Sequence, residues 1–303
     1  MNWSVLVNLA LAMVLTEPSG QLEPLELISV LPIESQGRKM DLSALTLVDG
    51  ELYTLSDKEN GVIYRLAFQE NHLVLLPYRD CGFSREVDYD FEGLTADDQG
   101  NFFMISERQS RVMCMPADGS PCHWVIPSLK REANKKNLLK LANGGFEGIA
   151  YLGNDLFVAC AERNERGLVS WRIDRENPDR VQDLIVVNGE NTTYGKVKHR
   201  SLDLSGLCFY KGKLLAIHRN NSLVSVISGY REGCFVEEKA WSYWHVEYEP
   251  EYRFKDKRYG LAEGIAIDDD RIYLVLDPNR DSREKYPDDY RSLLFVFKKP
   301  AEL

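Results

Sequence analysis

The sequence lacks the short motifs that mark several large enzyme classes. It contains no G-x-S-x-G nucleophile elbow, no Walker A loop and no H-E-x-x-H zinc motif. Its six cysteines include no C-x-x-C pair, so zinc-binding and thioredoxin-type functions also lose support. No low-complexity segment or interdomain linker is visible. The remaining evidence lies in charge, in the N-terminal region and in internal repeats.

An excess of positive charge is also missing, because the formal net charge is −10. A protein whose main partner is a nucleic acid needs a basic patch, so nucleic acid is excluded as the main partner. The acidic balance fits a cation or a cationic ligand. It also fits the ordinary role of net charge in keeping a protein soluble. The oligomeric state is not determined by the sequence.

The apolar run at residues 3–15 is too short to span a bilayer comfortably. Its length fits the hydrophobic region of a signal peptide, so we interpret residues 1–20 as a signal or N-terminal hydrophobic segment. We therefore expect a periplasmic or secreted protein, with membrane association through the N-terminus as a variant. No Lys or Arg precedes the run. An apolar N-terminal strand or a misplaced start codon is the alternative.

Structural roles can be inferred for four of the cysteines. Cys160 and Cys208 lie in apolar strands and are interpreted as buried thiols. Cys114 and Cys122 flank one hairpin turn and are candidates for a disulfide in an oxidising compartment.

One short motif recurs along the chain. Its copies begin at Asp41-Leu-Ser-Ala-Leu, Asp90-Phe-Glu-Gly-Leu, Gly145-Phe-Glu-Gly-Ile, Asp203-Leu-Ser-Gly-Leu and Leu261-Ala-Glu-Gly-Ile. The third residues of the copies lie 49, 55, 58 and 58 positions apart, by subtraction. A fixed period of this length is typical of propellers and solenoids. Here the units are short apolar strands separated by Gly, Asn and Asp turns, which favours four-stranded propeller blades.

The repeats predict an all-β fold, a five-bladed β-propeller formed by residues 21–303 as a single domain. The last repeat contains only three apparent strands. An N-terminal strand at residues 22–34 can supply the fourth and close the ring. Closure removes both exposed sheet edges at once.

In a propeller the first strand of each blade lines the central channel, so the third motif residue of each copy should form a ring there. This first ring consists of Ser43, Glu92, Glu147, Ser205 and Glu263. A second ring, 14 or 15 residues further on, comes from the ends of the second strands. It consists of Asp57, Glu107, Glu162, Arg219 and Asp277, with His218 as an alternative to Arg219.

Three carboxylates that converge on a narrow channel repel one another, and without a counter-charge one of them would stay protonated. Glu92, Glu147 and Glu263 are therefore candidate ligands of a hard cation such as Ca²⁺ or Mg²⁺, and Ca²⁺ is the expected cofactor. The alternative is structural: each Glu or Ser accepts backbone N–H groups of the neighbouring blade and locks the ring. The two interpretations can hold together.

Other candidates are weaker. Arg108 and Arg163 follow second-ring acids and are expected to form salt bridges. His199, His218 and His245 show no metal-ligand spacing. The aromatic stretch at residues 241–254 could be a binding lip at one channel mouth or a packed insertion, and residues 130–140 could form a short helix or a loop.

The motif copies resemble the SdiA-regulated, or YjiK-like, propeller family. The resemblance rests on Asp90-Phe-Glu-Gly-Leu, Gly145-Phe-Glu-Gly-Ile-Ala-Tyr with Glu162-Arg-Asn, Asp203-Leu-Ser-Gly-Leu and Ala262-Glu-Gly-Ile-Ala-Ile-Asp. It implies a five-bladed propeller, an exported or inner-membrane-anchored bacterial protein, a link to calcium and a relation to esterase-like phytase propellers. It brings no established catalytic residues.

Three classes of function remain. The first, which we favour, is a non-catalytic propeller that binds a small ligand or Ca²⁺ in its acidic channel, as an envelope sensor or scaffold. The second is a hydrolase of phosphoesters, esters or glycosides, since paired carboxylates serve as acid and base when their environments separate their pKa values. The third is a protein-interaction platform that uses the aromatic stretch.

Overall fold

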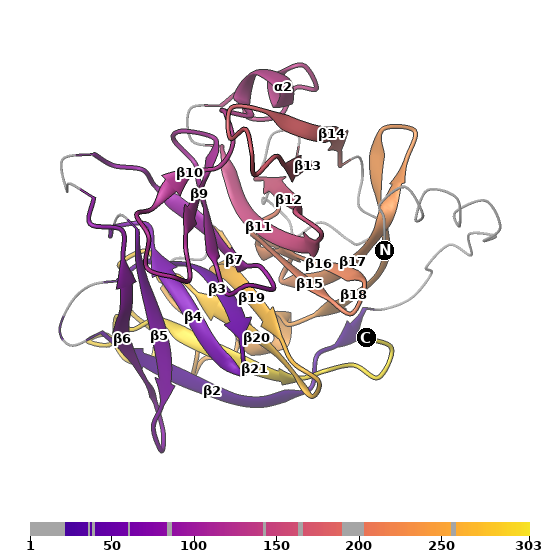
Figure 1. Ribbon diagram of the computed structural model, residues 1–303. Helices are drawn as coiled ribbons and strands as arrows, with labels where there is room; N and C mark the ends of the chain where they lie inside the picture. Colours follow the sequence, from indigo (N-terminus) through magenta and orange to yellow (C-terminus); the bar gives the residue numbers. More distant parts are fainter. Residues whose placement is uncertain are drawn as a thin grey trace.

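A computed structural model shows β-strands arranged around a common centre (Figure 1). It describes residues 22–35, 37, 40–59, 61–83, 87–141, 144–162, 166–189, 203–255 and 259–303. The N-terminal hydrophobic segment at residues 1–20, Arg163 and His199 lie outside these ranges. Within them, no helix is long and apolar enough to cross a membrane.

The strands follow one another in antiparallel runs of four along the chain. The first run comprises β3 (Leu42–Val48), β4 (Glu51–Ser56), β5 (Val62–Phe68) and β6 (Leu73–Asp80). The second comprises β7 (Phe91–Ala96), β8 (Phe102–Ser106), β9 (Arg111–Met115) and β10 (His123–Trp124). The third comprises β11 (Phe146–Gly153), β12 (Leu156–Ala161), β13 (Gly167–Ile173) and β14 (Val181–Asn188). The fourth comprises β15 (Gly206–Tyr210), β16 (Lys213–His218), β17 (Leu223–Arg231) and β18 (Cys234–Ser242).

The last run is assembled from both ends of the described chain. It comprises β19 (Ala262–Ile267), β20 (Arg271–Leu276), β21 (Leu293–Lys298) and β2 (Leu27–Glu34). The antiparallel pairing of β2 with β21 is the one expected from the sequence. A short strand β1 (Glu23–Pro24) precedes it and pairs with β18.

Two parallel pairings link outermost strands and merge runs into larger sheets. β14 meets β18 through Asn188 and Cys234, and β2 meets β6 through two residue pairs. The described strands therefore form sheets of nine, four and eight strands. The prediction of an all-β fold is confirmed.

Hairpin turns occur where the sequence places residues that tolerate positive φ. Asp49 and Gly50, which join β3 to β4, have φ values of 51° and 80°. Two-residue turns of this kind match the twist of the flanking strands, and they require Gly, Asn or Asp. This turn is one of the Gly, Asn and Asp turns that separate the apolar strands in the sequence.

The first strands of the runs contact one another in chain order, β3 with β7, β7 with β11, β11 with β15 and β15 with β19, and β19 contacts β3 (Figure 1). Glycines allow these strands to approach closely. A Cβ on Gly148 would lie 2.8 Å from the backbone nitrogen of Leu207, and a Cβ on Gly264 would lie 2.3 Å from that of Leu45. No real Cβ sits so close to backbone, so the glycine after the third motif residue is required by packing.

Apolar side chains fill the space between neighbouring runs. Tyr53 and Phe91 belong to a cluster between the first and second runs, and Leu45 and Leu294 belong to one between the first and last. Corresponding clusters lie between the other neighbours. Because each run is apolar on both faces, it is stable only between two others.

Few helices interrupt the strands. The described ones are α2 (Lys130–Asn134), α3 (Trp244–Glu247) and the 3-10 helix η1 (Arg219–Asn221). Of the two alternatives for residues 130–140, a short helix or a loop, the structure has a short helix at Lys130–Asn134. Around α3, the side chains of Trp241, Tyr243 and Phe254 are buried in the core, so most of the aromatic stretch is a packed insertion.

The predicted disulfide between Cys114 and Cys122 was wrong, because Cys122 has another partner. Cys122 pairs with Cys81, 41 residues earlier, and Cys114 is a free, buried thiol. Cys81 and Cys122 come from different strand runs, so only their packing brings them together. Cys160 is a buried free thiol, as expected, and Cys208 is free and half-buried.

Candidate functional site: an acidic channel

Three carboxylates of the first ring line one narrow cavity. Glu92, Glu147 and Glu263 border it together with the glycines that follow them, each from the first strand of a different run. The cavity has a volume of about 10 Å³, which is close to the space that one water molecule needs. An ion or a water fits between these side chains, and an organic substrate does not.

The two serines of the first ring act as bonds between neighbouring strand runs. The Ser43 hydroxyl donates to the carbonyl of Phe91 at 2.8 Å, and the Ser205 hydroxyl donates to the carbonyl of Ala262 at 2.7 Å. Both serines are buried. They lock the ring as the structural alternative expected, although through carbonyl acceptors and not through N–H donors.

The second ring lies beside the first because backbone hydrogen bonds hold its residues next to the starts of the first strands. The N–H groups of Asp57, Glu107, Glu162 and Asp277 donate to carbonyls of residues just before the first strands of their own runs. One side chain also joins two runs, since Oε1 of Glu107 accepts from the N–H of Gly145 at 3.0 Å.

One half of the channel contains a buried cation, Arg219. Its Nε donates to Oδ2 of Asp203 at 2.8 Å, its Nη1 to Oε1 of Glu263 and its Nη2 to Oε1 of Glu162. Burial acts to lower the pKa of Arg219, but the surrounding carboxylates outweigh it and raise the pKa well above its usual value. Arg219 therefore stays charged and holds three acids from different strand runs.

His218 does not take the place of Arg219. It is fully buried and belongs to a network below the channel with Arg166, Ser225 and Glu237. Nδ1 of His218 lies 3.0 Å from Nη1 of Arg166, which can only donate, so Nδ1 accepts. Nε2 of His218 lies 2.6 Å from the Glu237 carboxylate.

The other half of the channel gathers three acids. Carboxylate oxygens of Asp57, Asp90 and Glu92 lie within 4.8 Å of one another. Among the described residues this is the group that could hold a metal ion. Of the predicted metal ligands it includes Glu92, whereas Glu263 bonds to Arg219 and Glu147 lies outside the group. The three predicted glutamates border one cavity, and the fold also places Asp57 and Asp90 beside Glu92.

Asp90 and Asp203 were not among the predicted site residues. Each is the first residue of a motif copy, two positions before the third residue, and Asp41 occupies the same position in the first copy. The signal was present as an aspartate that recurs in three copies. Asp90 has a positive φ of 53°, a conformation that Asp tolerates better than most residues.

The three-acid group has two basic neighbours. Lys58 pairs with Asp57 and lies 3.7 Å from Asp41. Arg108 lies 3.4 Å from Asp90 but 2.6 Å from Asp88, as expected for a salt-bridge partner. One oxygen of Asp57, Oδ1, is buried without a hydrogen-bond partner.

Burial and mutual repulsion raise the pKa values of the channel acids. For Glu92 and Glu147 burial is the largest cause and nearby carboxylates add to it, so their pKa values lie well above the usual range. Burial raises the pKa of Asp57 to about 6, and that of Glu263 to about 8 although Arg219 opposes the shift.

Two further second-ring acids behave in the same way. Burial raises the pKa of Glu107 and of Asp277 to about 7, with the neighbouring carboxylates of Asp90 and Asp41 adding to the respective shifts. The channel therefore holds protons near neutral pH, which a cation would displace.

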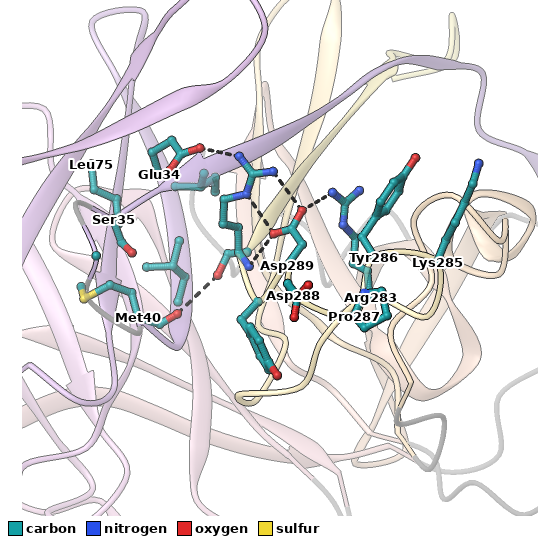
Figure 2. A pocket seen from close by; sticks show the side chains of 16 residues that line it. Glu34, Ser35, Met40, Leu75, Arg283, Lys285, Tyr286, Pro287, Asp288 and Asp289 are labelled. Atoms are coloured by element: carbon teal, nitrogen blue, oxygen red, sulfur yellow. Dashed lines mark hydrogen bonds and ion pairs between the residues drawn. The ribbon is translucent and has the colours of Figure 1, made fainter.

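A separate cleft of about 880 Å³ lies at the outer seam where β2 meets β21 (Figure 2). Four of its charged side chains bond to one another. Arg291 bridges Glu34 and Asp289, and Asp289 also accepts from Arg283. The exposed ring of Tyr286 stands on its rim.

Comparisons with known proteins agree with this architecture. The Myxococcus xanthus glutaminyl cyclase structure aligns over 92% of this chain and all of its own, with 13% identity and a TM-score of 0.52. Virginiamycin B lyase from Staphylococcus aureus aligns over 89% of this chain and 98% of its own, with 11% identity and a TM-score of 0.45. No curated protein matches the sequence.

The fold and its inner ring define the protein as a β-propeller. The chain belongs to the phytase-like family, described as "esterase-like activity of phytase", whose profile matches residues 40–232.

Replacement of Arg219 by Met should destabilise the protein strongly. Glu162, Asp203 and Glu263 would lose their common partner while remaining buried, and breaking a buried pair costs about 3–5 kcal/mol. The exposed pair of Arg65 and Glu51 provides the control, since Arg65→Met should cost at most about 1 kcal/mol. Denaturant unfolding measures both, and equal losses would contradict the role of Arg219.

In metal-free protein, stability should fall as the pH rises from about 5 to 8. Asp57, Glu107, Asp277 and Glu263 have folded-state pKa values of about 6, 7, 7 and 8, above their ordinary values. A raised acid pKa means that the folded state binds more protons, so this stability is complete below the unfolded pKa and is lost as pH rises through the folded pKa. The loss should exceed about 1.4 kcal/mol, the equivalent of one pKa unit. Thermal unfolding in chelator across this range measures it, and a rise in stability toward pH 8 would contradict it.

Proposed function

We propose that the protein is a five-bladed propeller of the SdiA-regulated, YjiK-like type that binds a divalent cation, Ca²⁺, in its channel. Each four-stranded run would be one blade, with β2 completing the blade of β19, β20 and β21. The closed order of contacts among the first strands supports this count. The relation of the matched family to phytase supports the family placement.

The observation that carries the cation proposal is the group of Asp57, Asp90 and Glu92. Opposite ligands of one Ca²⁺ ion lie about 4.6–5.2 Å apart, twice the usual Ca–O distance, so oxygens within 4.8 Å can surround an ion with little movement. The donors are all oxygens, which suit a hard cation and not a soft one. Backbone carbonyls and water would complete the shell.

A cation would also compensate the negative charge in the half of the channel that contains Asp57, Asp90 and Glu92. Arg219 is a buried cation that pairs with Glu162, Asp203 and Glu263, whereas the cations beside Asp57, Asp90 and Glu92 are Lys58 and Arg108, both partly exposed. Binding would convert protonated acids into ionised ligands, so it releases protons.

We further propose export to the periplasm or the outside, as a ligand-binding sensor or scaffold of the cell envelope. The apolar run at residues 3–15 supports a signal, and the Cys81–Cys122 disulfide fits an oxidising compartment. N-terminal sequencing of protein from its native host should find a chain that starts after this run. Cytoplasmic protein with an intact Met1 would contradict export.

A second candidate function is hydrolysis of an ester or phosphoester, favoured by the description of the matched family. The channel cavity of about 10 Å³ cannot admit such a substrate, so the substrate would bind at a channel mouth or in the outer cleft of about 880 Å³. The channel acids could then act only at the mouth.

Calcium should raise the melting temperature of protein stripped with chelator. At a hundredfold excess over the dissociation constant, binding stabilises the folded state by roughly 2.7 kcal/mol, or about 4 °C for a chain of this length. Glu92→Gln should shrink the rise, because it removes a charged ligand without changing the shape of the side chain. Differential scanning fluorimetry with and without Ca²⁺ measures both effects.

Glu238→Gln provides the matched control, because Glu238 is an exposed acid outside the channel. This variant should keep the full response to calcium. A wild-type protein that melts at one temperature in chelator and in calcium would refute the cation proposal, and the acids would then be locks between strand runs. Loss of a measurable esterase or phosphatase activity in Glu92→Gln would instead favour hydrolysis.

A further inference from the structure

Lys58 is the basic group in closest contact with the proposed cation site. It follows Asp57 directly after the end of β4, and its Nζ pairs with the Asp57 carboxylate and lies 3.7 Å from Asp41. The side chain of Lys58 is 44% exposed, whereas those of Asp57 and Asp41 are 13% and 4% exposed. The ammonium group therefore lies between the buried acids and solvent.

A second observation marks this part of the channel as a binding site and not only as a group of acids. Glu147 is 7% exposed and has no hydrogen-bond or ion-pair partner among the described residues, yet it lines the same cavity as Glu92. Oδ1 of Asp57 is also buried without a partner. Buried polar atoms are almost always satisfied, so the unpartnered Oδ1 of Asp57 points to a missing ligand.

We propose that Lys58 is a built-in counter-ion of this site, which a divalent cation displaces when it binds. This inference rests on the proposed cation binding and extends it to the control of affinity. In the metal-free protein the ammonium of Lys58 partly neutralises Asp57. In the bound protein the ion takes over the Asp57 carboxylate, and the lysine side chain turns outward to solvent.

Two physical features make the exchange feasible. A lysine side chain has a long flexible stem, and this one already reaches solvent, so its ammonium can leave at little cost in desolvation. By contrast, Arg219 is buried with three carboxylate partners, so it cannot be displaced in the same way. The two halves of the channel thus differ in how firmly their cation is held.

The test compares calcium binding by wild-type protein and Lys58→Gln, by isothermal titration calorimetry at fixed pH and 0.15 M salt. Removal of the competing charge should tighten binding about two- to fivefold, the range that corresponds to a partly exposed ion pair. Lys58→Arg, which keeps the charge, should bind with nearly wild-type affinity.

A thermal measurement provides a readout specific to displacement. In chelator, Lys58→Gln should melt below wild-type protein, because Asp57 has lost its partner. At saturating calcium the two proteins should melt at nearly the same temperature, because Lys58 is then displaced in the wild type as well. The rise caused by calcium is therefore larger in the variant.

Arg280→Gln is the charge-matched control. Nε of Arg280 lies 3.5 Å from Asp41, at the same mouth, but no contact joins it to Asp57, Asp90 or Glu92 among the described residues. This variant removes the same charge without removing the competitor, so its affinity should change less than that of Lys58→Gln.

The outcomes separate the two proposals. A wild-type protein without a response to calcium overturns the proposed function. If wild-type protein binds calcium and Lys58→Gln binds it with unchanged or weaker affinity, only the exchange is overturned. An equal gain in Lys58→Gln and Arg280→Gln would also overturn it, because the effect would then be general electrostatics at the mouth.

Discussion

The structure depends on how the negative charge in the channel is compensated, because closure of the ring brings several carboxylates together there. Glu92, Glu147 and Glu263 come from strands far apart in the chain, and the contacts of those strands bring their carboxylates to one narrow cavity. Such convergence is unfavourable unless protons or cations compensate it. Arg219 supplies a buried cation to one half, and Lys58 and Arg108, which are partly exposed, pair with the acids of the other half.

This asymmetry links fold to function. The serines at the third motif position are structural, since Ser43 and Ser205 bond directly to the neighbouring strand. The glutamates at the same position make no such bonds to the neighbouring strand: Glu263 pairs with Arg219, whereas Glu92 and Glu147 face the cavity. The third motif position thus provides a bond that closes the ring in runs with Ser, and an acidic side chain in runs with Glu. This difference in role explains why the position varies between Ser and Glu. The narrowness of the cavity limits the channel itself to ions and water, so chemistry on larger molecules belongs at its mouths or in the outer cleft.

Much of the architecture could be predicted from the sequence because its cause is local and repeated. Apolar strands, Asp-Gly turns such as Asp49-Gly50 and a motif that returns about every 55 residues identified the strand runs and their innermost strands. The missing fourth strand of the last run led to the correct pairing of β2 with β21. The partner of Cys122 was missed because Cys81 lies in another strand run, and proximity within one hairpin was the only sequence guide to pairing.

The sequence by itself determined that Glu92, Glu147 and Glu263 meet at one cavity, because they occupy the same position of the repeat in the innermost strands. Only the tertiary structure decided which of these residues interact. Arg219 reaches Glu263, Asp203 and Glu162, while Asp57 and Asp90 lie close to Glu92. These choices depend on side-chain direction and on distances of a few ångströms across the ring. Such distances follow from how the strand runs pack against one another, and no single repeat encodes them.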